Sequence, residues 1–136
     1  MPGSGIARHV IAVDPGTHKC GLAVLDSTGA VVWQAIISRD QVFARVSELL
    51  AKYTGAQVAI GGSTQGSVLS DEFMREGDIS ARMVDETDST MLARELFWRE
   101  NRPGCLWAIF PPSFRPLPRP IDDYAAIIIG RRFLAD

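Results

Sequence analysis

The sequence predicts an α/β domain in which helices flank a mixed five-stranded sheet. Three apolar, β-branched runs follow one another through short turns within the first 38 residues, and this spacing leaves no room for crossover helices. Two further apolar runs come after helical patterns, as expected for parallel strands joined by crossovers. An apolar helical pattern ends the sequence. Strands one to three should therefore be antiparallel, and strands four and five parallel.

The first three strands are expected at residues 9–13, 20–25 and 30–38. Asp14-Pro15-Gly16 is a turn sequence that separates the first two runs, and Asp26-Ser27-Thr28-Gly29 separates the second from the third. These turns predict an antiparallel meander.

The clearest helical pattern covers residues 42–53, where apolar residues recur at helical spacing before Gly55. Ser38 with Gln41 resembles a capping box in front of it. The short apolar run at 58–60 follows this helix and should lie parallel to the first strand.

The second half alternates in the same way. Residues 61–66, Gly-Gly-Ser-Thr-Gln-Gly, are expected to form a loop at the carboxyl end of strand four. The remaining elements are expected to be one or two helical turns within 70–77, a fifth strand at 80–84, a helix from Ser89 or Thr90 to Asn101, and a last helix at 122–134. Acids at the start of that last helix and cations near its end suit the helix dipole.

Between these last two helices, residues 102–120 cannot be regular structure throughout, because six of the eight prolines fall between Pro103 and Pro120. The segment is expected to be a rigid irregular loop or a mobile flap. Its aromatic residues, Trp107, Phe110 and Phe114, are expected to pack against the protein.

The composition fits one globular domain spanning residues 1–136. The sequence is 46% hydrophobic and 22% charged, which argues against a disordered or coiled-coil protein, and its apolar runs are too short for a membrane span. Residues 1–5 show no basic segment followed by an apolar one, so the expected location is the cytoplasm. The two cysteines, Cys20 and Cys105, are expected to be buried.

Charge is distributed unevenly. The formal net charge is −2, but residues 1–90 carry −4 and residues 91–136 carry +2, so the C-terminal third is the basic end. Of the 14 cationic residues 12 are arginine, which suits phosphate contacts but also follows from genomic base composition.

Acidic residues stand at the ends of three predicted elements: Asp14 after the first strand, Asp85 and Glu86 after the fifth, and Asp122 and Asp123 at the start of the last helix. The carboxyl ends of parallel strands meet at one edge of a sheet, so these acids can converge. Clustered carboxylates suit Mg²⁺ or Mn²⁺, and such ions promote phosphodiester hydrolysis. Taken singly, each acid is more often a turn or capping residue.

Three segments carry a family resemblance. Residues 11–24, with Asp14-Pro15-Gly16-Thr17, resemble the opening Asp-x-Gly-Thr hairpin of the YqgF (RuvX) branch of RuvC-like nucleases, which have the ribonuclease H fold. Residues 84–90 are similar to that branch's Asp-Glu-Arg-x-Ser/Thr-Thr segment, and residues 121–126 to its terminal Asp-x-x-Ala-Ala helix start. Thr87 stands where the family has Arg, and residues 61–66 replace a Gly-Leu-Pro segment.

The resemblance implies a ribonuclease H-like, divalent-metal-dependent nuclease. Its catalytic residues and metal ligands would be Asp14, Glu86 and Asp122, with Asp85 or Asp123 as alternates if the register shifts by one. It implies a substrate among structured nucleic acids, either the ends of pre-16S ribosomal RNA or branched DNA like a Holliday junction. The choice between RNA and DNA, and between monomer and homodimer, stays open.

Substrate contacts are expected from three groups of residues. The hairpin loop beside Asp14 offers a hydroxyl and two cationic or titratable groups, the loop after strand four offers hydroxyl and amide groups, and the basic end offers guanidinium groups for phosphate. The residues are Thr17, His18 and Lys19; Ser63, Thr64 and Gln65; and Arg94, Arg115 and Arg119. Trp107 or Phe114 would stack on unpaired bases if they did not pack in the core.

Two other functions are consistent with the sequence. The protein would be a non-catalytic nucleic-acid-binding or ribosome-assembly factor if the fold had lost turnover, and the missing Arg after Glu86 and the acidic pI motivate this alternative. A nucleotide-binding fragment of an actin-like kinase would share the opening motif, but that fold needs far more than 136 residues.

Overall fold

The computed structural model describes residues 8–136. The predicted absence of a leader segment concerns residues 1–5, which lie outside the described residues. Among the helices that the structure describes, none combines the length and the apolar character needed to cross a lipid bilayer.

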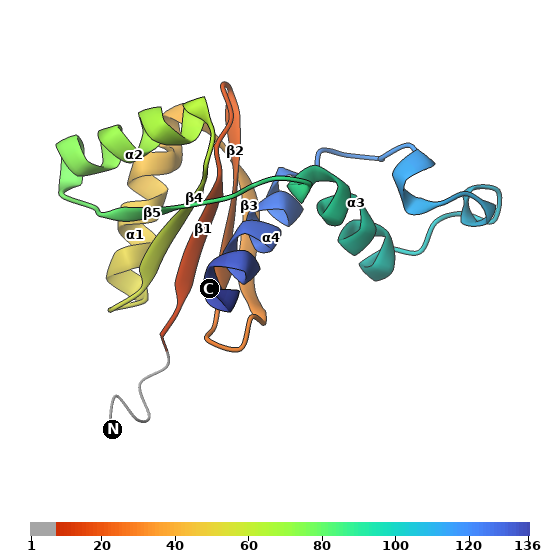
Figure 1. The fold of residues 1–136 in the computed structure, drawn as a ribbon, viewed down its shortest axis with the longest axis horizontal. Helices are drawn as coiled ribbons and strands as arrows, with labels where there is room; N and C mark the ends of the chain where they lie inside the picture. The colour runs from red at the N-terminus through yellow and green to blue at the C-terminus, as the bar shows by residue number, and fades with distance from the viewer. Residues whose placement is uncertain (1–7) are drawn as a thin grey trace.

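The five strands form one mixed sheet in the order β3-β2-β1-β4-β5, as predicted (Figure 1). β1 pairs antiparallel with β2 and β2 with β3, whereas β4 runs parallel to both β1 and β5. The strands are β1 (Val10–Asp14), β2 (Lys19–Leu25), β3 (Val31–Ser38), β4 (Gln57–Gly61) and β5 (Ala81–Val84).

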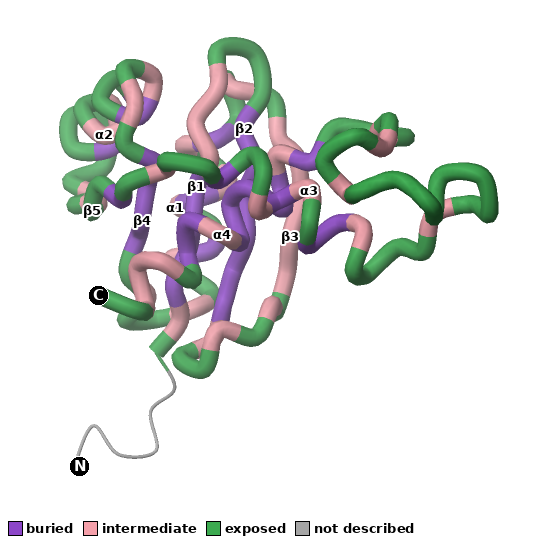
Figure 2. The backbone as a smooth tube through the Cα atoms, turned by 45° about the vertical axis from the view of Figure 1, so that its right-hand side comes forward, coloured by how far each residue is buried: buried purple, intermediate pink, exposed green. Residues whose placement is uncertain are grey.

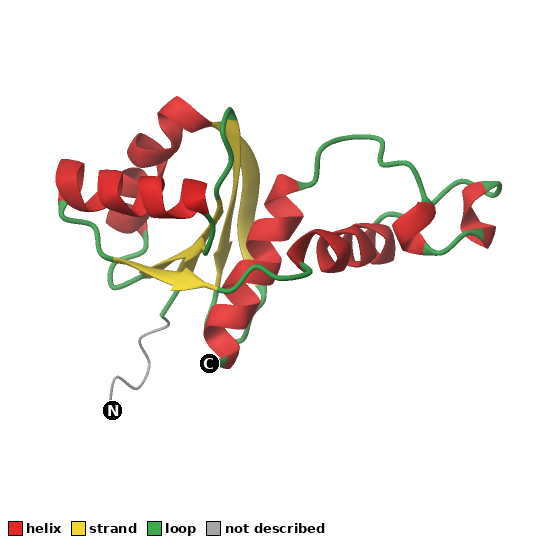
Figure 3. Cartoon of the chain, turned by 45° about the horizontal axis from the view of Figure 1, so that its top comes forward, coloured by secondary structure: helices red, strands yellow, loops and turns green. Residues whose placement is uncertain are grey.

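Helices cover both faces of the sheet (Figure 3). The long ones are α1 (Val42–Lys52), α2 (Thr64–Gly77), α3 (Ser89–Glu100) and α4 (Asp122–Ala135), and three short 3₁₀ turns are η1 (Arg39–Gln41), η2 (Trp107–Ile109) and η3 (Pro112–Phe114). The expected capping box at Ser38 does not form, because the chain enters a 3₁₀ turn there and the Ser38 side chain makes no capping hydrogen bond.

The prediction of a loop at 61–66 is wrong from Thr64 onward. α2 begins at Thr64 and runs for 14 residues, where only one or two turns within 70–77 were predicted. Ser63 caps the helix, since its hydroxyl oxygen accepts a hydrogen bond from the Gly66 N–H at 3.1 Å. Leu69 and Phe73, one helical turn apart, are fully buried against the sheet. This burial outweighs the low helix propensity of Gly66 and its serine neighbours.

Side chains alternate between two cores. Ile11 and Val13 of β1 point into the core shared with α1 and α2, while Val10 and Ala12 point into the core shared with α3 and α4. The residues facing α4 are small, and a β-carbon on Gly130 would lie 2.5 Å from Leu25 Cδ1. α4 therefore packs very closely on the centre of the sheet.

Residues 102–120, called the arm below, project from the body beside α3 (Figure 1). Most of this segment is exposed, as Figure 2 shows. The expectation that its aromatic residues pack in the core is wrong for Trp107, Phe110 and Phe114, which are all exposed. The expectation of two buried cysteines holds for Cys20 and is wrong for Cys105, because Cys105 lies on the arm.

Candidate carboxylate site

Three elements bring a carboxylate to the same edge of the sheet. Asp14 is the last residue of β1, Glu86 follows the end of β5, and Asp122 is the first residue of α4. β1, β4 and β5 are parallel, so their carboxyl ends share this edge.

Gly21 brings Asp122 to Asp14. In the β1–β2 pair Asp14 lies opposite Gly21, and a β-carbon on Gly21 would lie 1.8 Å from the main-chain carbonyl oxygen of Asp122. Any side chain at this position of β2 would push the first turn of α4 away from the sheet. The missing β-carbon therefore lets α4 begin directly beside the end of β1.

Gly61 leaves space for the Glu86 side chain in the same way. A β-carbon on Gly61, at the end of β4, would lie 3.0 Å from Glu86 Oε2 and 3.2 Å from Pro15 Cδ. Glu86 thus reaches across the end of β4 toward the residue that follows Asp14. Gly21 lies in the hairpin segment 11–24 and Gly61 opens the segment 61–66, but neither was predicted to position an acid, although a glycine inside a strand is a known sign of close approach by another chain segment.

The electrostatics of Asp14 reflect this convergence. Burial, together with the negative charges of Asp122 and Glu86, raises the pKa of Asp14 from 3.8 to about 7. Burial is the largest of these three causes. At neutral pH the site therefore holds more negative charge than its surroundings stabilise.

The β1–β2 hairpin forms a pocket of about 300 Å³ beside Asp14 and Asp122. Asp14, Asp122 and residues 15–19 line it. The Lys19 ammonium lies 3.7 Å from Asp122 Oδ2, and its side chain is half exposed. The structure thus brings Thr17, His18 and Lys19 together with Asp14 and Asp122.

The alternate acids are engaged elsewhere. Asp85 Oδ1 accepts hydrogen bonds from the Thr87 N–H at 3.0 Å and the Thr87 hydroxyl at 2.7 Å, and these bonds lower the pKa of Asp85. It lines a different pocket, together with Arg132 and Asp136.

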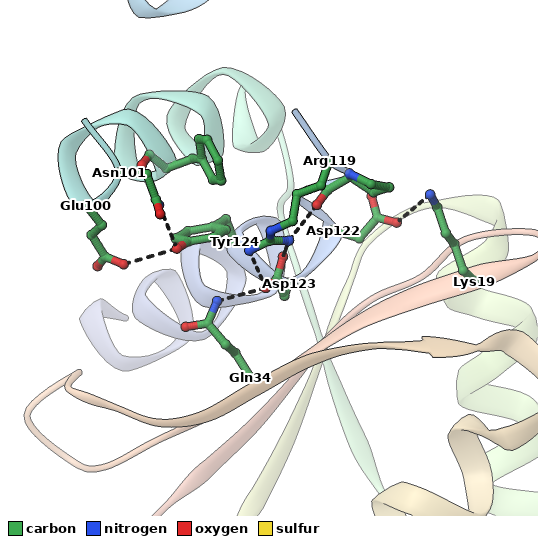
Figure 4. Close-up of polar contacts among 10 residues, drawn as sticks. Lys19, Gln34, Glu100, Asn101, Arg119, Asp122, Asp123 and Tyr124 are labelled. Atoms are coloured by element: carbon green, nitrogen blue, oxygen red, sulfur yellow. Dashed lines mark hydrogen bonds and ion pairs between the residues drawn. The ribbon is translucent and has the colours of Figure 1, made fainter. Parts of the chain in front are cut away.

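Asp123 is buried and belongs to a structural network (Figure 4). Its carboxylate accepts hydrogen bonds from Gln34 Nε2 at 2.8 Å and from both terminal nitrogens of Arg119 at 3.2 and 3.3 Å. The Arg119 guanidinium also lies over the rings of Phe97 and Tyr124. Sequence reasoning missed this network, since Gln34 and Asp123 are 89 positions apart.

The other predicted substrate residues do not line the hairpin pocket. Ser63, Thr64 and Gln65 form the capped start of α2, after β4. Arg94 donates a hydrogen bond to the Arg115 carbonyl, and Arg115 donates to the carbonyls of Trp107 and Ala108. Arg94 therefore ties the arm to α3, Arg115 braces the arm internally, and Arg119 ties the arm to α4.

The candidate site offers carboxylate oxygens as ligands for a divalent ion. Carboxylate oxygens from three elements are the ligands that Mg²⁺ and Mn²⁺ prefer, and a cation would offset the mutual repulsion of Asp14, Asp122 and Glu86. Within residues 8–136, however, no group of three or more His, Cys, Asp or Glu side chains is already close enough to ligate one ion. The residues fit the ion by chemistry, and their side chains would have to close around it.

Solved structures share this architecture. The large terminase nuclease from thermophilic phage G20c is 17% identical, with a TM-score of 0.58 over 91% of this chain and 81% of that one. The RuvC protein of T. thermophilus, solved in complex with a Holliday junction substrate, is 15% identical, with a TM-score of 0.57 over 90% of each chain. No protein-family model and no curated protein matches the sequence. The likeness shows that the chain has the ribonuclease H-like fold.

Proposed function

We propose that this protein is a divalent-metal-dependent nuclease that hydrolyses phosphodiester bonds in structured nucleic acid. One observation carries the proposal: Asp14, Glu86 and Asp122 come from three separate elements and lie close enough for the last two to raise the pKa of the first. Perturbed acids in a pocket are typical of catalytic sites. The fold shared with two nucleases supports the same conclusion.

Asp14, Glu86 and Asp122 would hold Mg²⁺ or Mn²⁺. When bound, such an ion supplies Lewis-acid stabilisation to a phosphodiester and to its leaving oxygen. Both glycines support this ligand set, because Gly21 and Gly61 leave the space in which Asp122 and Glu86 approach β1.

The hairpin residues of the pocket would position the phosphate. The Lys19 ammonium is paired with Asp122 at 3.7 Å but remains half exposed, so it can pair with a phosphate oxygen at the pocket mouth. Thr17 and His18 line the same pocket and offer a hydroxyl and an imidazole to that phosphate.

For the substrate, we propose pre-16S ribosomal RNA ends or branched DNA that resembles a Holliday junction. The first follows from the motif resemblance, and the second also from the RuvC structure, which holds a junction substrate. A cytoplasmic location goes with both substrates.

The test is cleavage of matched precursor-rRNA and four-way-junction DNA substrates in Mg²⁺, Mn²⁺ or EDTA. We expect the wild type to cut one of them only with a divalent ion. Asp14→Asn should lower the cleavage rate at least about 100-fold, since it removes a ligand from the reacting centre.

Asp78→Asn is the matched control, because it makes the same chemical change at the exposed end of α2. Asp78 has a left-handed backbone conformation, and asparagine readily adopts this conformation. It should cut like the wild type. Full activity of Asp14→Asn, or equal cleavage in EDTA, would contradict the proposal.

A non-catalytic binding or ribosome-assembly factor is the second candidate. The observation in its favour is that residues 8–136 contain no three metal-ligating side chains already close enough to share an ion. Thr87, where the family has Arg, points the same way. Binding of either substrate in EDTA, with no cleavage under any metal condition, would establish this function instead.

A further inference from the structure

The arm exposes large aromatic side chains that a folded segment normally buries. Phe114 is 73% exposed, Trp107 40% and Phe110 39%. The rings of Trp107 and Phe110 lie 5.3 Å apart, at 46° to each other. Exposed apolar groups gathered on one segment mark an interaction surface.

Polar groups, not an apolar core, hold the arm in shape. The Arg115 guanidinium donates to the carbonyls of Trp107 at 3.0 Å and Ala108 at 3.4 Å, and it lies over the ring of Trp98. Arg94 donates to the Arg115 carbonyl at 3.0 Å and so ties the arm to α3. The arm thus turns Arg115 inward and its aromatic rings outward.

The charge of the arm identifies its partner. Residues 102–120 contain three arginines and no acidic residue, so the arm carries a formal charge of +3, although the charge of Arg119 is offset by Asp123. Arg99 of α3 and Arg102, the first residue of the arm, are exposed and form no ion pair among residues 8–136. A polyanion is attracted to the arm, whereas a second positively charged arm is repelled.

Both ends of the arm are fastened beside the candidate site (Figure 4). At one end Asn101 donates to the Tyr124 hydroxyl at 3.2 Å, and at the other Arg119 is paired with Asp123. Tyr124 and Asp123 belong to the first turn of α4, which also carries Asp122. The Arg119 end of the arm therefore adjoins the turn that carries Asp122, and a strand that follows the arm to this end reaches the carboxylates.

We infer that the arm binds unpaired bases of a nucleic acid, which stack on Trp107, Phe110 and Phe114 while nearby arginines attract the backbone. Aromatic rings combined with cations bind single strands in this way, with little sequence preference. This inference rests on the proposed function and adds to it that the substrate carries an unpaired stretch beside the bond that is cut.

The test is binding of a fluorescein-labelled single-stranded oligonucleotide, as RNA and as DNA, measured by anisotropy in EDTA. We expect tighter binding of either single strand than of its perfect duplex. Phe114→Ala should weaken single-strand binding roughly tenfold, and Trp107→Ala/Phe114→Ala should weaken it further.

Ile109→Ala is the matched control, since Ile109 is 78% exposed on the same arm but has no ring. It should change the affinity less than about twofold. Equal losses in Ile109→Ala and Phe114→Ala, or equal affinity for single strand and duplex, would overturn the inference. So would a wild type that sediments as a dimer and becomes a monomer in Phe114→Ala, because the rings would then form a protein interface.

Measuring cleavage and binding on the same wild-type and Phe114→Ala proteins separates this inference from the proposed function. Ring-dependent binding by a wild type that cuts neither substrate under any metal condition supports the arm and contradicts the nuclease. Metal-dependent cleavage that Phe114→Ala leaves unchanged supports the nuclease and contradicts the arm.

Discussion

At the scale of single residues, Asp14 links the site to stability. Its pKa is raised from 3.8 to about 7 by folding, so between about pH 4 and pH 7 the folded state binds more protons than the unfolded state. The free energy of unfolding therefore falls as pH rises through this range. At about 1.4 kcal/mol per pKa unit, the free energy of unfolding falls by at most about 4 kcal/mol. Solvent around the partly exposed carboxylate makes the actual loss smaller.

Replacing Asp14 with Asn should remove this cost. In EDTA at pH 8 we expect Asp14→Asn to unfold at a higher urea concentration than the wild type, and near pH 4 the two proteins should unfold together. Urea titrations at both pH values measure the difference. A mutant that is less stable at pH 8 would show that folding does not raise this pKa.

Gly21 carries the second prediction at this scale. Gly21→Ala should lower the free energy of unfolding by at least about 2 kcal/mol, because its β-carbon would meet the main chain of Asp122, which cannot move aside as a flexible side chain would. Gly104→Ala is the control, since nothing lies within 4 Å of a β-carbon there. Urea unfolding compares the two, and an equal effect would contradict the close approach of α4.

At the scale of elements, the first turn of α4 joins the arm to the sheet through the Arg119–Asp123 pair. Arg119→Met removes the guanidinium from the Phe97 and Tyr124 rings and leaves the buried Asp123 charge with Gln34 alone. We expect a loss of about 3 kcal/mol, because an unpaired buried charge is costly. Arg119→Met/Asp123→Asn should recover part of it, which a double-mutant cycle measures.

Arg75→Met tests whether any lost ion pair would have the same effect. Arg75 and Glu76 are both exposed and 3.8 Å apart, so this change should cost no more than about 0.5 kcal/mol. Equal losses at Arg75 and Arg119 would mean that the network around Asp123 contributes nothing particular.

The elements also show what the sequence could and could not predict. All five strands and their directions were predictable, because the turns after β1 and β2 and the helix before β4 fix the pairing. The helix α2 was not predictable, because its glycine and serines are typical of a loop. The burial of Leu69 and Phe73, which stabilises the helix, depends on contacts far along the chain. For the site, the resemblance named Asp14, Glu86 and Asp122 and left Asp123 as an alternate, but the bonds that hold Asp123 to Gln34 and Arg119 depend on packing that the sequence does not show.

At the scale of the whole molecule, a body of sheet and helices carries an exposed arm, and proteases should distinguish the two. Each arginine of the arm precedes a proline, at 102–103, 115–116 and 119–120, so trypsin should not cut there. Chymotrypsin should cut first after Trp107 or Phe114, while the aromatic residues of the cores are protected.

Mass spectrometry of the first fragments checks this prediction. The two chymotryptic fragments should remain together on native gel filtration, because α4 packs on β1 and β2 after the cut. First cuts within the strands, or fragments that separate, would contradict the division into body and arm.

Because Asn101 and Arg119 both contact the first turn of α4, the arm leaves and re-enters the body at nearly one place. The entropy of closing such a loop grows only with the logarithm of its length, by about 0.6 kcal/mol for each doubling. Insertions and deletions in the arm would therefore leave the stability of the sheet almost unchanged. Evolution, or a protein engineer, can remodel this segment while the carboxylates stay in place.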